Sequence, residues 1–265
     1  MHQPEPFFRE AGAGPAIVCI HSNASSSGQW RDLMASFSAK FRVIAPDSYD
    51  SGKSPKSPSG RIANLRDEVA FLEPVLTRAG SPLVLVGHSY GAAVALIAAL
   101  ANPARVRALA LYEPTLFALL DAESPPPNAA EGIREAVSDM KAALEVGNSE
   151  AAAERFIDYW MGPGSWRQTP ERRKPRIAGS MNNVRRWAHA LFTDPTPLEA
   201  FRSLNVPVLY MVGKRSPASA HGVARLLLAR LPRVEFVEFD ELGHMGPVTH
   251  PVPVNDTIGR FLERH

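Results

Sequence analysis

Ser89 is the residue of this sequence whose surroundings most clearly indicate chemistry. It lies in the pentapeptide GHSYG (residues 87–91), between the apolar run 83–86 and a run of small and apolar residues, 92–101. A serine flanked by glycines, after a strand and before a helix, is typical of a tight turn that exposes a nucleophilic hydroxyl. The alternative interpretation is a glycine-rich turn that contains an incidental serine.

A serine hydroxyl needs a base to remove its proton before it becomes a good nucleophile. Of the eight histidines, His244 is the best placed, because it follows the last predicted strand. His250 is the alternative base. His21 and His88 lie beside strand ends, where a structural hydrogen-bonding role is expected.

The loop that follows residues 16–20 is expected near the serine, because loops after neighbouring parallel strands meet at one edge of a sheet. A backbone N–H of this loop could pair with the N–H of Tyr90. Two such donors stabilise the negatively charged oxygen that develops during acyl transfer.

Short apolar runs alternate with helical patterns along the chain, which predicts an α/β fold with a mostly parallel central sheet flanked by helices. The expected strands are residues 16–20, 41–45, 83–86, 106–111, 208–212 and 234–239. The expected helices are residues 29–38, 62–77, 90–101, 222–231 and 254–264. The alternating pattern of residues 234–239 indicates a strand nearer the sheet edge.

Residues 114–200 contain no convincing strand and hold three of the four tryptophans. Helical patterns near residues 131–146 and 150–160 indicate a helical insertion over the sheet. Among its large apolar side chains, Trp160 and Trp187 are candidate substrate-binding residues. The alternative is that these groups form the core of the insertion itself.

The composition excludes several classes of function. Lys and Arg together exceed Asp and Glu by only 2, and no long basic run occurs, so nucleic-acid binding is not expected. No metal-ligand cluster and no dinucleotide-binding motif occurs, so neither a metal nor a cofactor is expected. The single cysteine, Cys19, lies in an apolar run and is expected to be a buried strand residue.

No apolar run reaches the ~18 residues needed to span a bilayer, and the start of the chain lacks a signal-like stretch. We therefore expect a soluble, cytoplasmic protein without a membrane partner. A small-molecule substrate is the expected partner, and a homodimer is compatible with the sequence.

The sequence resembles the α/β-hydrolases that carry a cap domain, over nearly its whole length. Residues 87–91 match the nucleophile elbow of that family, and residues 243–244 match its catalytic-histidine loop. Residues 21–23 stand in place of the His-Gly-x oxyanion loop, and residues 47–54 in place of the D-x-x-G-x-G-x-S loop. The resemblance implies an α/β-hydrolase fold with a helical cap insertion.

The resemblance also implies roles for individual residues. Asn23 and Tyr90 would supply the oxyanion donors through their backbones, and Ser22 stands where the family usually has glycine. The expected domains are an α/β-hydrolase core of residues 1–113 and 201–265 and a helical cap of residues 114–200.

The carboxylate that should orient the histidine is not at its usual place. Most relatives carry it after the strand that follows the cap, where this chain has Ser216, and no Asp or Glu occurs between Lys214 and Arg233. Some relatives carry the acid one strand earlier, and Glu113 ends that strand here. Glu113 is therefore the predicted acid; the alternative is a glutamate that caps a helix or forms an ion pair.

Together these residues predict a serine hydrolase, of esterase type, that cleaves a carboxylic ester, thioester or lactone. Ser89 argues against haloalkane dehalogenases and epoxide hydrolases, which use aspartate as nucleophile. Acyltransfer and carbon–carbon bond hydrolysis use the same catalytic set and stay open. A ligand-binding or signalling protein with weak catalysis is the alternative from another class.

Overall fold

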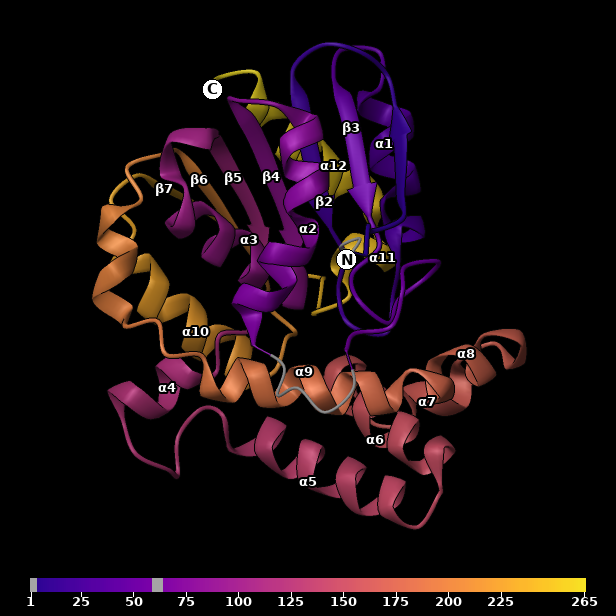
Figure 1. Ribbon diagram of the computed structural model, residues 1–265. Coiled ribbons are helices and arrows are strands. Elements are labelled where there is room, and N and C mark those ends of the chain that lie inside the picture. Colours follow the sequence, from indigo (N-terminus) through magenta and orange to yellow (C-terminus); the bar gives the residue numbers. More distant parts are fainter. Residues whose placement is uncertain (1–3, 59–63) are drawn as a thin grey trace.

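In the computed structural model, which describes residues 4–58 and 64–265, the strands form one sheet in the order β1-β3-β2-β4-β5-β6-β7 (Figure 1). Their bounds are β1 Phe8–Ala11, β2 Ala16–Ile20, β3 Arg42–Pro46, β4 Leu83–His88, β5 Val106–Tyr112, β6 Val208–Gly213 and β7 Val234–Phe239. Only β1 is antiparallel to its described neighbour; the other pairs are parallel. The predicted α/β class with a mostly parallel sheet is confirmed.

Burial explains the strand patterns. Every residue of β2, β4 and β6 is buried, as expected for parallel strands covered on both faces. β7 lies at one edge of the sheet, and its side chains alternate between partly buried and exposed toward its end. β1, at the other edge, was not predicted from the sequence, because this short strand contains no buried residue.

Helices cover both faces of the sheet (Figure 1). Side chains of α2 (Leu65–Ala79), α3 (Tyr90–Ala101) and α10 (Ala218–Leu228) share the larger hydrophobic core with one face. Side chains of α1 (Arg31–Phe37) and α12 (Pro251–Leu262) share a second core with the other face. α2 begins at Leu65, after Asn64 caps it, and residues 62 and 63 of the predicted helix lie outside the described residues.

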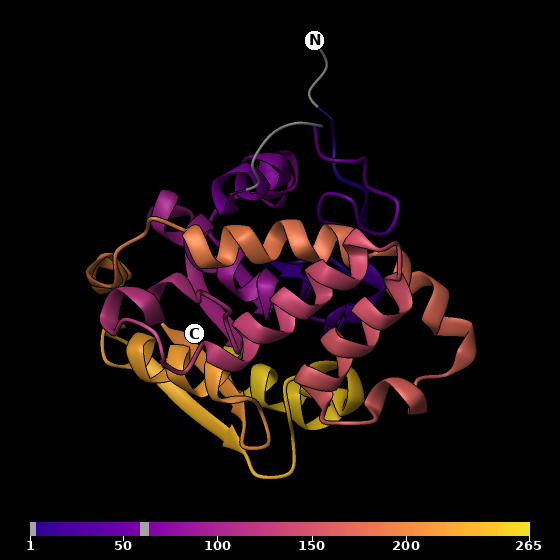
Figure 2. The ribbon, with the colours of Figure 1, turned by 90° about the horizontal axis from the view of Figure 1, so that it is seen from below.

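A group of helices between β5 and β6 lies across one end of the sheet (Figures 1 and 2). They are α4 Ala118–Glu123, α5 Glu131–Glu145, α6 Ser149–Met161, α7 Ser165–Gln168, α8 Lys174–Gly179 and α9 Met181–Thr193. We call this group the helical layer. Met140, Trp166, Met181 and Val184 belong to a small hydrophobic core within it, separate from the cores beside the sheet.

Candidate active site

Ser89 occupies the turn between β4 and α3 with a positive φ of 57°. The flanking glycines are required by close packing. A Cβ on Gly91 would lie 2.2 Å from the carbonyl oxygen of Ile20, and one on Gly87 would lie 2.5 Å from Cα of Ala92. Any side chain at either position would require the backbone to move. Because glycine occupies both positions, this tight turn can form.

The structure brings Ser89, His244 and Glu113 into one hydrogen-bonded line. Ser89 Oγ lies 2.9 Å from Nε2 of His244, and Nδ1 of His244 lies 2.6 Å from Oε2 of Glu113. In the neutral imidazole, Nδ1–H donates to the carboxylate, and Nε2 accepts the serine proton. All three side chains are buried.

Glu113 follows β5 directly, with a positive φ of 48° and no exposed surface. Its second oxygen, Oε1, accepts hydrogen bonds from the backbone N–H of Gly213 at 2.7 Å and from Oγ of Ser216 at 2.6 Å. Ser216 stands at the position where the family resemblance places the acid, and its hydroxyl donates to Glu113. These donors compensate a carboxylate that would otherwise be costly to bury.

Two contacts fix the loop that carries His244. His88 Nε2–H donates to the carbonyl oxygen of His244 at 2.8 Å, and the hydroxyl of Tyr112 donates to the carbonyl oxygen of Gly243 at 2.8 Å. Gln29 donates to the other ring nitrogen of His88 at 3.1 Å. Burial lowers the pKa of His88 well below its ordinary value, so the ring stays neutral and can accept from Gln29. His250, the alternative base, instead lies at an exposed position beside Thr249.

The expected oxyanion donors are Tyr90, which follows Ser89 directly, and Asn23, on the loop after β2. Tyr90 is the first residue of α3, where a backbone N–H has no partner within its own helix. Asn23 lines the same pocket as Ser89. The loop before it is held by Gln29, whose side-chain oxygen accepts hydrogen bonds from the N–H and hydroxyl of Ser22.

A pocket of about 340 Å³ of empty space, its mouth included, opens beside Ser89. Its polar lining residues are Asn23, Ser89 and Thr115, and the helical layer supplies most of its apolar lining. The apolar residues are Phe117, Ile133, Val137, Phe156, Trp160, Val184, Ala188 and Leu191.

The two tryptophans predicted to bind substrate have different surroundings. Trp160 lines the pocket, and its ring also stacks on the ring of His244, with centroids 3.7 Å apart and planes inclined by 23°. Trp187 is not among the lining residues. Its ring lies 5.0 Å from the ring of Tyr90, in the larger hydrophobic core.

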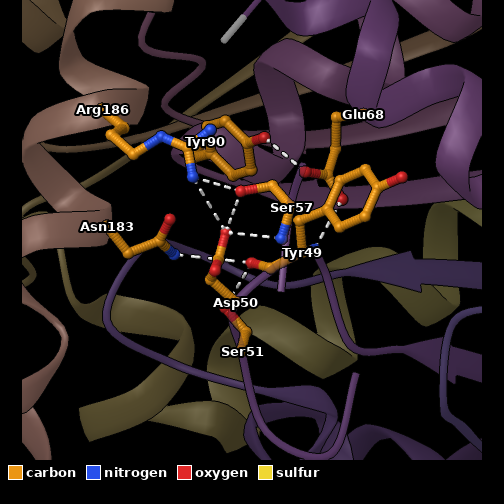
Figure 3. Close-up of polar contacts among 8 residues, drawn as sticks. All are labelled: Tyr49, Asp50, Ser51, Ser57, Glu68, Tyr90, Asn183 and Arg186. Atoms are coloured by element: carbon orange, nitrogen blue, oxygen red, sulfur yellow. Dashed lines mark hydrogen bonds and ion pairs between the residues drawn. The ribbon is translucent and has the colours of Figure 1, made fainter. Parts of the chain in front are cut away.

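Glu68 is a buried carboxylate beside the site, and it was not identified from the sequence. Its oxygens accept hydrogen bonds from the hydroxyl of Tyr90 at 2.9 Å and from the N–H of Tyr49 at 3.1 Å (Figure 3). Burial is the main cause that raises its pKa to about 7. The signal was available: Glu68 follows Leu65 by three residues and precedes Leu72 by four, which places it on the buried face of α2.

A polar cluster next to Glu68 joins the core to α9 of the helical layer (Figure 3). Arg186 lies 3.5 Å from a carboxylate oxygen of Asp50 and also contacts Oγ of Ser57. Asn183 donates to the carbonyl oxygen of Tyr49 at 3.4 Å. The cluster therefore fixes α9 against the loop that also binds Glu68.

In the described part of the chain, no group of three or more His, Cys, Asp or Glu side chains could hold a metal ion. None of the helices within residues 4–58 and 64–265 combines the length and the apolar character needed to cross a bilayer.

Comparison with known proteins extends over almost the whole chain. The family model described as "Alpha/beta hydrolase family" matches residues 17–257. A putative carbamate hydrolase, RutD, from Pantoea ananatis is 26% identical over 94% of this chain and 88% of its own length. A 2-(acetamidomethylene)succinate hydrolase from Mesorhizobium japonicum is 34% identical over 51% of this chain and 50% of its own length.

Solved structures show the same fold. MGS-M2, an alpha/beta hydrolase from a Medee basin deep-sea metagenome library, has a TM-score of 0.81 with 17% identity, over 99% of this chain and 96% of its own. A thermophilic esterase from Thermogutta terrifontis has a TM-score of 0.74 with 22% identity, over 98% of this chain and 93% of its own. With a family model that covers nearly all of its sequence, this chain belongs to the alpha/beta hydrolase family and is a hydrolase.

Proposed function

We propose that this hydrolase cleaves a carboxylic ester, thioester or lactone through an acyl-enzyme on Ser89. The observation that carries the proposal is the unbroken line of hydrogen bonds from Ser89 through His244 to Glu113. Such a line activates a serine hydroxyl for nucleophilic attack, whereas a protein that only binds ligands has no need of it.

The mechanism follows from the positions of these groups. His244 Nε2 takes the proton of Ser89 as Oγ attacks the substrate carbonyl, and the backbone N–H groups of Asn23 and Tyr90 stabilise the resulting oxyanion. His244 then gives the proton to the leaving group, and the acyl-enzyme forms. Water, activated by His244, releases the acid in the second half. Glu113 keeps Nδ1–H in place and stabilises the imidazolium in both halves.

The pocket supports an uncharged, largely apolar acyl group. No charged side chain is found among the lining residues that the structure describes. An ionised carboxylate on the acyl chain would lose its hydration there without gaining a cation, which is unfavourable. The proposed substrate therefore differs from a succinate-type substrate, which the name of the Mesorhizobium relative would suggest.

The proposal is tested with p-nitrophenyl esters of graded acyl length and the variant Ser89→Ala. We expect wild-type turnover of short and medium esters, and a loss on the order of 10⁶ in kcat for the variant. Ser36→Ala, at an exposed position of α1, is the matched control and should keep wild-type rates. A Ser89→Ala protein that keeps more than about a tenth of the activity would exclude Ser89 as nucleophile.

A further inference from the structure

Thr115 combines features that the proposed mechanism leaves unused. It lines the pocket that contains Ser89, and only 2% of its surface is exposed. Its hydroxyl is buried and has no hydrogen-bond partner. Of the lining residues that the structure describes, Thr115 alone has such a buried, unpartnered polar side-chain atom.

The position of Thr115 is fixed relative to the catalytic groups. It follows Glu113 by two residues, and its carbonyl oxygen accepts a hydrogen bond from the N–H of Phe117 at 3.0 Å. Glu113 is anchored in turn to Gly213 and Ser216. Thr115 is therefore held by the same rigid segment that orients His244.

A buried hydroxyl without a partner is unfavourable, because it has lost its bonds to water and gained none. A ligand that brings an oxygen atom to this hydroxyl recovers the missing bond, whereas an all-carbon ligand does not. Sites of this kind discriminate strongly against analogues that lack the hydrogen-bonding group. The rest of the lining is apolar except for Asn23 and Ser89, so the recognised oxygen belongs to an otherwise apolar group.

We propose that Thr115 is a specificity-determining residue that hydrogen-bonds a hydroxyl or carbonyl oxygen on the acyl chain of the substrate. The substrate class is then an ester of a short acid with an uncharged oxygen substituent near the scissile carbonyl. This inference rests on the proposed function, because it assigns the pocket to the acyl group.

The first experiment compares kcat/KM for p-nitrophenyl butanoate with the values for its 2-hydroxy and 3-hydroxy derivatives. The preference for a hydroxylated ester is measured in the wild type and in Thr115→Val, which replaces the hydroxyl by a methyl group of similar size. Dividing one preference by the other cancels the intrinsic reactivities of the esters. We expect the preference for one of the two isomers to fall about tenfold in Thr115→Val, the usual effect of one hydrogen bond.

Two further variants separate recognition from packing. Thr115→Ser keeps the hydroxyl and should keep the preference within about threefold of the wild type. Thr196→Val removes another buried, unpartnered hydroxyl that does not line the pocket, and should leave the preference unchanged. Equal preferences in the wild type and Thr115→Val for both isomers would overturn the proposal.

A binding measurement makes failure of this inference distinguishable from failure of the proposed function. In a Ser89→Ala background, calorimetry gives the Kd values of methyl butanoate and its 2-hydroxy and 3-hydroxy derivatives without turnover. We expect about tenfold tighter binding of one hydroxylated ester, and loss of that difference when Thr115→Val is added. If the wild type hydrolyses no ester but this difference is found, the proposed chemistry is wrong and the assignment of Thr115 holds. No difference in binding contradicts the assignment, whatever the activity.

Discussion

At the scale of single residues, the position of Glu113, the proposed acid, is the feature that departs most from the family pattern. Glu113 reaches His244 from the end of β5, and Ser216, at the position where the family resemblance places the acid, donates to Glu113. With Glu113 as the proposed acid, the chain order serine, acid, histidine is kept. Because both carboxylate oxygens of Glu113 have partners, its orientation is set by the core and not by the substrate.

The first prediction is that Glu113→Gln loses about 10⁴ in kcat on an ester that the wild type hydrolyses. The amide keeps the shape of the carboxylate but favours the wrong tautomer of His244 and cannot stabilise the imidazolium. Steady-state kinetics measure the loss, and thermal unfolding checks that the variant is folded. Glu241→Gln, an exposed glutamate three residues before His244, is the control and should retain activity. Wild-type kcat in Glu113→Gln would mean that another group orients the histidine.

The proximity of Ser89, His244 and Glu113 could be predicted because each follows an apolar strand, and parallel strands bring their ends together. Glu68 was missed because a lone glutamate within a helix belongs to no motif, although its spacing from Leu65 and Leu72 placed it on the buried face of α2. The stacking of Trp160 on His244 could not be predicted either, since it depends on how α6 packs over the sheet. Contacts between residues 84 positions apart are fixed by tertiary packing, which periodicity does not encode.

At the scale of elements, α2 and α9 support the catalytic turn from the side. α2 presents Glu68 to the hydroxyl of Tyr90, and α9 presents Trp187 to the ring of the same tyrosine. The ion pair between Arg186 and Asp50 links α9 to the loop whose Tyr49 N–H also binds Glu68 (Figure 3). The first residue of α3 is thus held by elements of both the core and the helical layer.

The second prediction concerns the dependence of stability on pH. The pKa of Glu68 is about 7 in the folded protein and has an ordinary value of 4.5. Between these values the folded state binds more protons than the unfolded state, so this residue makes stability fall as pH rises. This difference in pKa corresponds to roughly 3 kcal/mol in the free energy of unfolding. That contribution is lost progressively between pH 4.5 and 7, and above pH 7 the stability changes no further through this residue.

Glu68→Gln cannot ionise and should remove this decline. Urea unfolding at pH 5, 6 and 8 measures the free energy of unfolding of the wild type and the variant. Between pH 5 and 8, we expect the free energy of unfolding of the wild type to fall by roughly 2–3 kcal/mol more than that of the variant. Glu123→Gln, at an exposed position at the end of α4, controls for the amide substitution. Parallel curves for Glu68→Gln and the wild type would show that Glu68 does not ionise in this range.

At the scale of the whole molecule, loops after the strands of the sheet carry the proposed catalytic groups, and the helical layer supplies most of the pocket. Ser89, Glu113 and His244 come from segments that follow β4, β5 and β7, whereas residues from α5, α6 and α9 line the space in front of Ser89. The α/β class and most of the strands were predictable, because continuous apolar runs mark buried parallel strands. The edge strand β1 was not, since it has no buried residue to create a pattern.

The central claim, that Ser89 carries a covalent acyl group during turnover, is tested most directly by mass spectrometry of the acid-quenched reaction. The wild type is mixed with excess p-nitrophenyl butanoate, quenched within milliseconds to seconds, and digested. We predict that the peptide containing Ser89 gains the mass of one butanoyl group, and that the Ser89→Ala protein gains none. Steady turnover of the ester without any acylated Ser89 peptide, or with the acyl group on another residue, would contradict this account.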